Sequence, residues 1–245
     1  EEVEFDGPQG QSFPVRTLPR PIQPKLPMWL TAAGSPDTFR EAGRLGAGVL
    51  THLLGQTMEE LAGKLAIYRS AWTEAGHAGN GHVTLMLHTF IGDDVEEVRN
   101  TVRRPMMNYL GSSLGLVKGF AQSWTAFKKR ADGSTSVDVD MNSLTAEEME
   151  GLLEYSFERY FETSGLFGDT ERALGIVDDL KGLGIDEIAC LIDFGVDEDA
   201  TLAHLAQLNH VRELSQPVAG ISDAAPEVDG SIAAQIERYA VTHLQ

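Results

Sequence analysis

The feature that most constrains the fold is an alternation of short apolar runs with stretches of helical spacing. Each run is rich in apolar residues and is bounded by turn residues, as a buried strand of a parallel sheet is. The runs lie at 28–33, 48–54, 82–91 and 187–194, and the helical stretches lie at 35–46, 57–76, from 95 onward, at 169–184 and at 198–214. Strands joined by helical crossovers run parallel. The alternation therefore predicts an α/β domain with a parallel sheet.

Four strand–helix units satisfy two architectures equally well. One is an open, doubly wound sheet, and the other is half of a closed eight-stranded barrel. Periodicity alone does not distinguish them. Before the first unit, the stretch 3–18 alternates around a turn at Asp6–Gly10 and predicts a surface hairpin. Between the third and fourth units, the polar segment 130–142 predicts an exposed loop within a largely helical region.

The charge balance limits the partners that the chain can have. It carries 37 acidic and 19 basic side chains, a formal net charge of -18, which would repel nucleic acid and an anionic membrane surface alike. We therefore expect neither as a partner. The single cysteine, Cys190, cannot form an internal disulfide or a multi-thiolate metal site, and the seven histidines show no metal-ligand spacing. We expect no metal, a cytoplasmic location and a buried Cys190.

The loop Ala33–Thr38, after the first apolar run, has the composition of an anion site and also of a plain helix cap. Ser35 precedes Pro36, a residue suited to the first helical turn. Free amides, the positive end of the helix dipole and the hydroxyls of Ser35 and Thr38 favour an anion, and Gly34 allows close approach of the backbone. A capping sequence explains the same residues, since nearly every helix begins with one.

Two histidines lie on the predicted strands. His88 belongs to the run 82–91, where a lone histidine is commonly a hydrogen-bonded core residue. His52 lies at the C-terminal end of the run 48–54, the end at which barrel enzymes gather their catalytic residues. Thr51 and His52 also fit a simple alternation between the core and the helix layer. Both histidines are therefore candidates for contact with a ligand.

The stretch from Pro27 to Leu54 resembles the fifth strand and helix of the bacterial-luciferase-like flavin monooxygenases. It contains Pro-Met-Trp-Leu-Thr-Ala-Ala-Gly-Ser-Pro-Asp-Thr-Phe, followed by Ala-Gly-Arg-Leu-Gly-Ala. In that family the loop after the strand holds the phosphate of FMN with a serine and with a threonine three residues on. The resemblance places Gly34, Ser35 and Thr38 at the cofactor-binding positions.

A second stretch, 83–97, is similar to the seventh strand of the family and to the acidic helix start that follows it. The alkanesulfonate branch carries Arg-x-His on one face of this strand, whereas this sequence has Met86-Leu87-His88. A sulfonate substrate would lack its cation here, so the departure disfavours that substrate. The histidine remains, and the resemblance implies that His88 and His52 are catalytic residues that hydrogen-bond the flavin or the substrate.

The resemblance implies the C-terminal half of a luciferase-like (β/α)8 TIM barrel over residues 1–214, with a helical insertion before the last strand. The first strands would lie upstream of Glu1, so we expect a missing N-terminal barrel half as a partner and an inactive chain in its absence. The implied enzyme uses reduced FMN from a flavin reductase, with dioxygen, to hydroxylate a small or carrier-tethered intermediate. The alternatives are a deazaflavin-dependent oxidoreductase of the same superfamily and a non-catalytic structural barrel module.

The segments 50–56 and 187–195 resemble the branch of natural product biosynthesis, whose luciferase-like domains occur inside nonribosomal peptide and polyketide synthases. Residues 215–230 are rich in Ser, Pro, Ala, Gly and Asp and predict a linker. The tail 231–245 is similar to a piece of adenylation domains. A C-terminal helix that packs on its own barrel is the other interpretation of this tail. Adenylation and carrier domains of a synthase are therefore expected partners.

Overall fold

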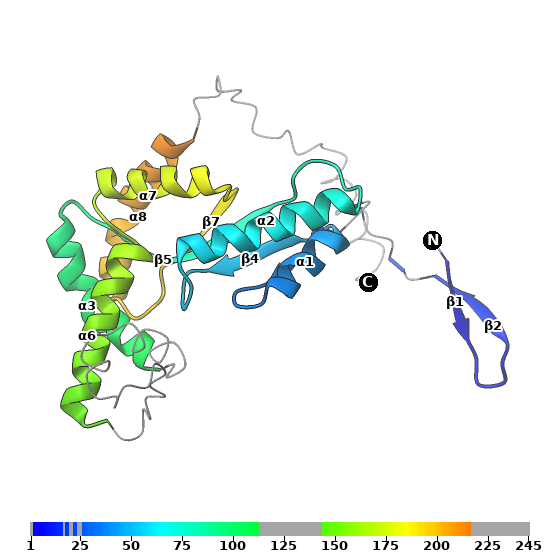
Figure 1. Cartoon of the computed structure of the whole chain (residues 1–245), viewed down its shortest axis with the longest axis horizontal. Helices are drawn as coiled ribbons and strands as arrows, with labels where there is room; N and C mark the ends of the chain where they lie inside the picture. Colours follow the sequence, from blue (N-terminus) through cyan, green and yellow to red (C-terminus); the bar gives the residue numbers. More distant parts are fainter. Residues whose placement is uncertain (1, 17, 20–21, 24–25, 113–143, 217–245) are drawn as a thin grey trace, which may run out of the picture. The chain divides into compact units, whose positions relative to one another are not determined.

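The computed structural model describes residues 2–16, 18–19, 22–23, 26–112 and 144–216 (Figure 1). The expected loop 130–142, the tail 231–245 and nearly all of the expected linker 215–230 lie outside the described residues. The chain forms two compact units. The first unit comprises Glu1–Met86 with Gly184–Ala189, and the second comprises Leu87–Leu183 with Cys190–Gln245. The boundary between the units crosses two strands, β5 (Val83–Ile91) and β7 (Glu187–Leu191).

The first unit begins with the predicted hairpin. Strand β1 (Val3–Asp6) pairs antiparallel with β2 (Ser12–Val15), and Gly10 takes a left-handed conformation, with a φ of 76°, in the turn between them. Every residue of both strands is exposed.

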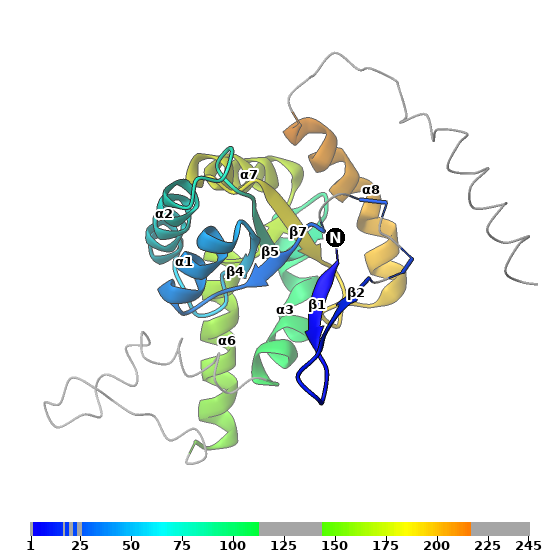
Figure 2. The same cartoon turned by 90° about the vertical axis from the view of Figure 1, so that its right-hand side faces the viewer.

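A parallel sheet follows the hairpin in the first unit. Strand β3 (Trp29–Thr31) pairs with β4 (Gly48–His52), and β4 pairs with the beginning of β5 (Val83–Ile91). Helices α1 (Pro36–Leu45) and α2 (Met58–Glu74) connect these strands and lie side by side (Figures 1 and 2). The pattern of parallel strands with helical crossovers is the one that the alternating sequence predicts.

Local sequence fixes where these two helices begin and end. Helix α1 starts after Ser35 and stops at Gly46, which takes a left-handed conformation with a φ of 66°. Thr57 and Glu60 form a reciprocal capping box at the start of α2, with N···O distances of 3.2 and 2.9 Å. The two helices pack closely because Gly43 has no side chain. A Cβ atom at Gly43 would lie 2.5 Å from the carbonyl oxygen of Tyr68.

Strands β3 and β7 are not buried, contrary to the prediction from the sequence. In β3, the side chains of Trp29 and Thr31 are exposed, and only Leu30 is half-buried. Among the described residues β3 has a partner strand on one side alone, namely β4. Strand β7 (Glu187–Leu191) is shorter than the predicted 187–194 and is half-buried or exposed throughout. Cys190 is exposed on β7, so the prediction of a buried thiol was wrong.

The second unit contains the rest of β5 and a group of helices. Strand β6 (Leu166–Gly168) pairs parallel with the end of β5, with Phe90 opposite Phe167. Strand β6 was not predicted from the sequence, because a strand of three residues is too short to show a period. The described elements of this unit after β5 are α3 (Val95–Gly111), α6 (Ala146–Thr163), β6, α7 (Thr170–Leu183), the end of β7 and α8 (Glu198–Ser215). Within the described residues, no helix has both the length and the apolar composition required to cross a bilayer.

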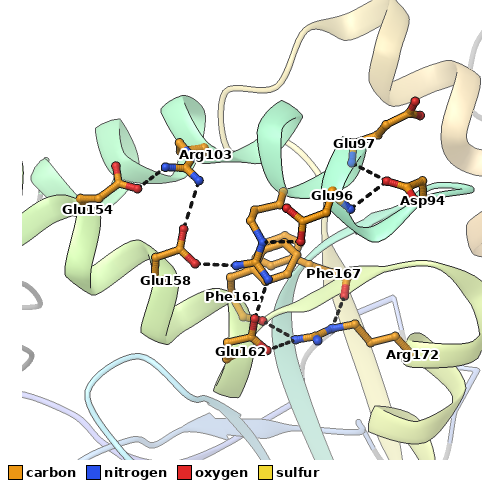
Figure 3. Close-up of polar contacts among 11 residues, drawn as sticks. Asp94, Glu96, Glu97, Arg103, Glu154, Glu158, Phe161, Glu162, Phe167 and Arg172 are labelled. Atoms are coloured by element: carbon orange, nitrogen blue, oxygen red, sulfur yellow. Dashed lines mark hydrogen bonds and ion pairs between the residues drawn. The ribbon is translucent and has the colours of Figure 1, made fainter.

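An ion-pair network joins α3, α6 and α7 in the second unit (Figure 3). The guanidinium of Arg99 contacts Glu158 at 2.5 Å and Glu162 at 2.6 Å, and its carbon lies 4.0 Å from the centre of the Phe161 ring. Arg172 contacts the same Glu162 at 2.9 Å. The side chain of Arg99 is only 13% exposed. A shielded guanidinium with several charge-assisted hydrogen bonds stabilises packing more than an exposed pair does.

The network also sets the ionisation of Glu162. Burial by itself would raise the pKa of this carboxyl group, but the hydrogen bonds from Arg99 and Arg172 outweigh burial. The pKa of Glu162 therefore lies below the ordinary value for glutamate.

Replacing Arg99 by methionine should lower the free energy of unfolding by about 1–3 kcal/mol, because Glu158 and Glu162 lose their shared cation. Urea denaturation followed by circular dichroism measures the change. The matched control is Arg104→Met, since Arg104 is 63% exposed and contacts Glu150 at 2.9 Å. That control should cost less than about 0.5 kcal/mol, and equal losses in the two variants would contradict a special role for Arg99.

The effect of Arg99→Met should also depend on pH. Because the pKa of Glu162 is lowered in the folded state, its stabilisation is complete above the pKa of an unfolded glutamate. It is lost as the pH falls through the lower folded pKa. The stability difference between wild type and Arg99→Met should thus shrink on acidification, which the same urea series tests at neutral and at acidic pH. A difference that stays constant over this range would argue against the pairing.

Candidate functional site

The loop between β3 and α1 is the first part of the candidate site, and it lies in the first unit. Ser35 is the N-cap of α1, but its side chain makes no capping hydrogen bond, contrary to the expected capping hydroxyl. Gly34 and Ser35 are exposed, and Thr38 is half-buried in the first helical turn. A Cβ atom built on Gly34 would meet no atom within 4 Å. The start of α1 therefore offers the Asp37 amide and a serine hydroxyl that the cap does not use, beside open space. Pro36 has no N–H, and the Thr38 amide already donates to the carbonyl oxygen of Ser35 at 3.2 Å.

A lysine from the next helix contacts this loop. The ammonium group of Lys64, on α2, donates to the carbonyl oxygen of Ala33 at 2.8 Å and to Oε1 of Gln56 at 2.7 Å. Lys64 was not among the site residues predicted from the sequence. A signal was present, because Lys64 lies between the buried Leu61 and Leu65, and helical spacing places it at the edge of the buried stripe.

Gln56 links Lys64 to the end of strand β4 by hydrogen bonds. Its side chain is buried, and Nε2 donates to the carbonyl oxygen of His52 and to Oγ1 of Thr51, the latter at 3.3 Å. Both ends of the Gln56 amide therefore have partners. We call the set Ala33, Lys64, Gln56, Thr51 and His52 the loop–strand network.

His52 is half-buried at the C-terminal end of β4, where the sequence predicted it. Its Nδ1 accepts a hydrogen bond from the amide of Leu54 at 3.2 Å, so the neutral ring carries its proton on Nε2. Burial lowers the pKa of His52, and the positive charge of Lys64 lowers it further. The pKa lies below the ordinary histidine value, and at neutral pH His52 can donate a hydrogen bond through Nε2.

His88 lies in the second unit and is completely buried. Its Nδ1 shares a hydrogen bond of 2.7 Å with the hydroxyl of Tyr160, and the rings of Tyr109, Tyr160 and Phe194 surround it at centroid distances of 4.4–5.5 Å. Burial raises the pKa of Tyr160. The cluster holds the imidazole in one orientation, and a contact between His88 and a flavin stays a prediction.

A groove of about 430 Å³ lies in the first unit, at the other end of the strands from the loop Ala33–Thr38. Its lining includes Trp29, Gly48 and His82, which stand at the N-terminal ends of β3, β4 and β5. None of the residues that the sequence predicted for the site lines this groove. In the described ranges no group of three or more His, Cys, Asp or Glu side chains is arranged to hold a metal ion.

Comparisons with known proteins agree on the fold. The family model described as "Luciferase-like monooxygenase" matches residues 1–187. Monooxygenase RslO1 from Streptomyces bottropensis is similar at a TM-score of 0.53 and 20% identity, over 86% of this chain and 54% of that chain. The oxygenating constituent of 3,6-diketocamphane monooxygenase from Pseudomonas putida was solved with FMN. It is similar at a TM-score of 0.52 and 16% identity, over 89% of this chain and 58% of that chain.

A third solved structure uses another cofactor. The coenzyme F420 dependent tetrahydromethanopterin reductase from Methanopyrus kandleri gives a TM-score of 0.50 and 13% identity, over 76% of this chain and 51% of that chain. At such identities the three likenesses show the fold alone. The chain spans about half the length of each of these proteins. A comparison with curated proteins gave no match.

Replacing Lys64 by methionine should raise the pKa of His52, because the substitution removes a positive charge that disfavours the imidazolium. Titration of the imidazole resonances by NMR measures the pKa directly. Lys64→Arg keeps the charge and should leave the pKa of His52 close to the wild-type value. Arg44→Met is the control for loss of one positive charge at the exposed end of α1. A pKa that responds equally to Lys64→Met and to Arg44→Met would contradict the local contact.

Proposed function

This chain belongs to the luciferase-like monooxygenase family, and we propose that it provides the FMN-phosphate site of a flavin-dependent monooxygenase. The observation that carries the proposal is the start of α1. There the hydroxyl of the N-cap Ser35 makes no cap hydrogen bond, and the space at Gly34 is open. Helix amides and short hydroxyls are the donors that a phosphate group prefers.

The donor set fits a phosphate monoester. Gly34, Ser35 and Thr38 would hold the phosphate through the amides of Gly34 and Ser35 and the two hydroxyls, with the positive end of the α1 dipole behind them. The ammonium of Lys64 lies 2.8 Å from the carbonyl of Ala33 and adds a cation at the same loop. Such a set suits a dianion better than it suits a neutral group.

The chemistry of oxygen transfer is that of the bound cofactor, because reduced flavin is the group that reacts with dioxygen. The residues of this chain would bind the cofactor, orient it and exclude water. His52 would donate a hydrogen bond from Nε2 to the flavin or the substrate, since Nδ1 is already engaged by the amide of Leu54. A contact between His88, on β5, and the flavin is proposed from the family resemblance alone.

The strands that complete the barrel and further partners belong to the same proposal. The exposed edge strand β3 and the roughly half-length coverage of the related structures support an N-terminal barrel half that pairs with this chain. We further propose a separate reductase that supplies reduced FMN. The resemblance of residues 50–56 and 187–195 to synthase-associated domains supports hydroxylation of a small or carrier-tethered intermediate in natural product biosynthesis.

A deazaflavin-dependent oxidoreductase is the second candidate function. The fold likeness to the F420-dependent reductase from Methanopyrus kandleri favours it, because the same barrel carries that cofactor there. Separate titrations of the full-length protein with FMN and with F420 distinguish the two. We expect saturable binding of FMN. Saturable binding of F420 without binding of FMN would favour the second candidate.

Replacing Ser35 and Thr38 together by alanine should weaken FMN binding, because each lost hydrogen bond to a charged group costs about 1.5–3 kcal/mol. Fluorescence titration of the full-length protein measures the dissociation constant. Thr73→Ala is the control, since Thr73 is an exposed residue of α2 whose hydroxyl donates to the carbonyl oxygen of Arg69. The proposal fails if the double variant and the control bind FMN equally well.

A further inference from the structure

The loop–strand network joins two neighbouring strand–helix units of the first unit by side chains alone. Lys64 reaches from α2 to the carbonyl of Ala33, which belongs to the loop before α1. The same ammonium group contacts Gln56, and Gln56 donates to Thr51 and His52 at the end of β4. A path of hydrogen bonds thus runs from the loop Ala33–Thr38 to the strand end that carries His52.

The charge of Lys64 has an unusual setting in this chain. Among the described residues, no carboxylate lies within ion-pair distance of Lys64, and its partners are the neutral oxygens of Ala33 and Gln56. By contrast, Lys181 pairs with Asp178 at 3.1 Å. A half-buried ammonium without a carboxylate partner, in a protein of net charge -18, leaves a positive charge beside the loop. The carbonyl oxygen of Ala33 would repel a phosphate bound near it. The ammonium group of Lys64 offsets this repulsion, because it is positively charged and contacts that oxygen.

We propose that Lys64 is the positioning residue of the flavin site: through Ala33 and Gln56 it holds the phosphate loop and the His52 strand end in one geometry and makes the loop selective for a dianionic phosphate. This inference rests on the proposed function. The effect of Lys64 on His52 is consistent with it, because the same charge that faces the loop also lowers the pKa of the imidazole.

The coupling between the loop and the strand end is testable without a cofactor. Gln56→Met removes both the acceptor for Lys64 and the donor to His52 and Thr51. In the wild-type background this substitution should shift the backbone amide resonances of residues 33–35, 37 and 38, and in the Lys64→Met background it should not. The control is Gln56→Met in the Arg44→Met background, where the resonances should still shift. Equal shifts of these five amide resonances in the wild-type and the Lys64→Met backgrounds would overturn the coupling.

The selectivity is tested by comparing FMN with riboflavin, which has the same ring system without the phosphate. In the full-length protein, Lys64→Met should weaken FMN binding about tenfold or more and change riboflavin binding by less than about threefold. Lys64→Arg should restore most of the preference for FMN. A purely structural lysine would change both affinities in the same proportion, so an unaltered ratio of the two dissociation constants would overturn the inference.

The two tests keep this inference separate from the proposed function. If the wild-type full-length protein binds neither FMN nor riboflavin, the proposed function is contradicted, and with it the selectivity assigned to Lys64. If the wild type binds FMN and the Lys64→Met variant keeps the wild-type preference for FMN over riboflavin, the positioning role fails while the proposed function stands.

Discussion

The parallel pairing of β3 with β4 is the constraint on which the candidate site depends. Parallel neighbours end at the same edge of a sheet, so the loop after β3 and the loop after β4 lie side by side. This adjacency allows Lys64 to contact Ala33 and Gln56 at 2.8 and 2.7 Å. The close approach of α1 and α2 at Gly43 brings the helix that carries Lys64 near the first loop. The contacts proposed for the loop therefore depend first on the parallel direction of β3 and β4, which places the two loops close together.

Much of this arrangement could be predicted from the sequence, because strong local signals agree with the tertiary fold. The apolar runs at 48–54 and 82–91 became β4 and β5, and the glycine after α1 took the left-handed conformation that ends a helix. Ser35 and Thr38 were found from a resemblance to a family loop, and the structure places both at the start of α1. Helix starts and buried parallel strands are encoded by neighbouring residues, so one sequence suffices to find them.

The remaining features depend on contacts between residues far apart in the chain. Lys64 and Ala33 are 31 residues apart, and the spacing in α2 shows only that Lys64 borders the buried stripe. Cys190 lies in an apolar run that predicts burial, yet β7 is half-buried or exposed throughout. The three-residue strand β6 is defined by its pairing with β5 and not by a period of its own. The aromatic cluster around His88 likewise requires residues from α3, α6 and the segment after β7.

A crystal structure of the full-length protein with FMN would show where the phosphate of the cofactor binds. Phosphate oxygens should lie within hydrogen-bond distance of the Ser35 and Thr38 hydroxyls and of the amides of Gly34 and Ser35. The proposed phosphate site is wrong if the FMN phosphate binds elsewhere and the loop Ala33–Thr38 contacts no part of the cofactor.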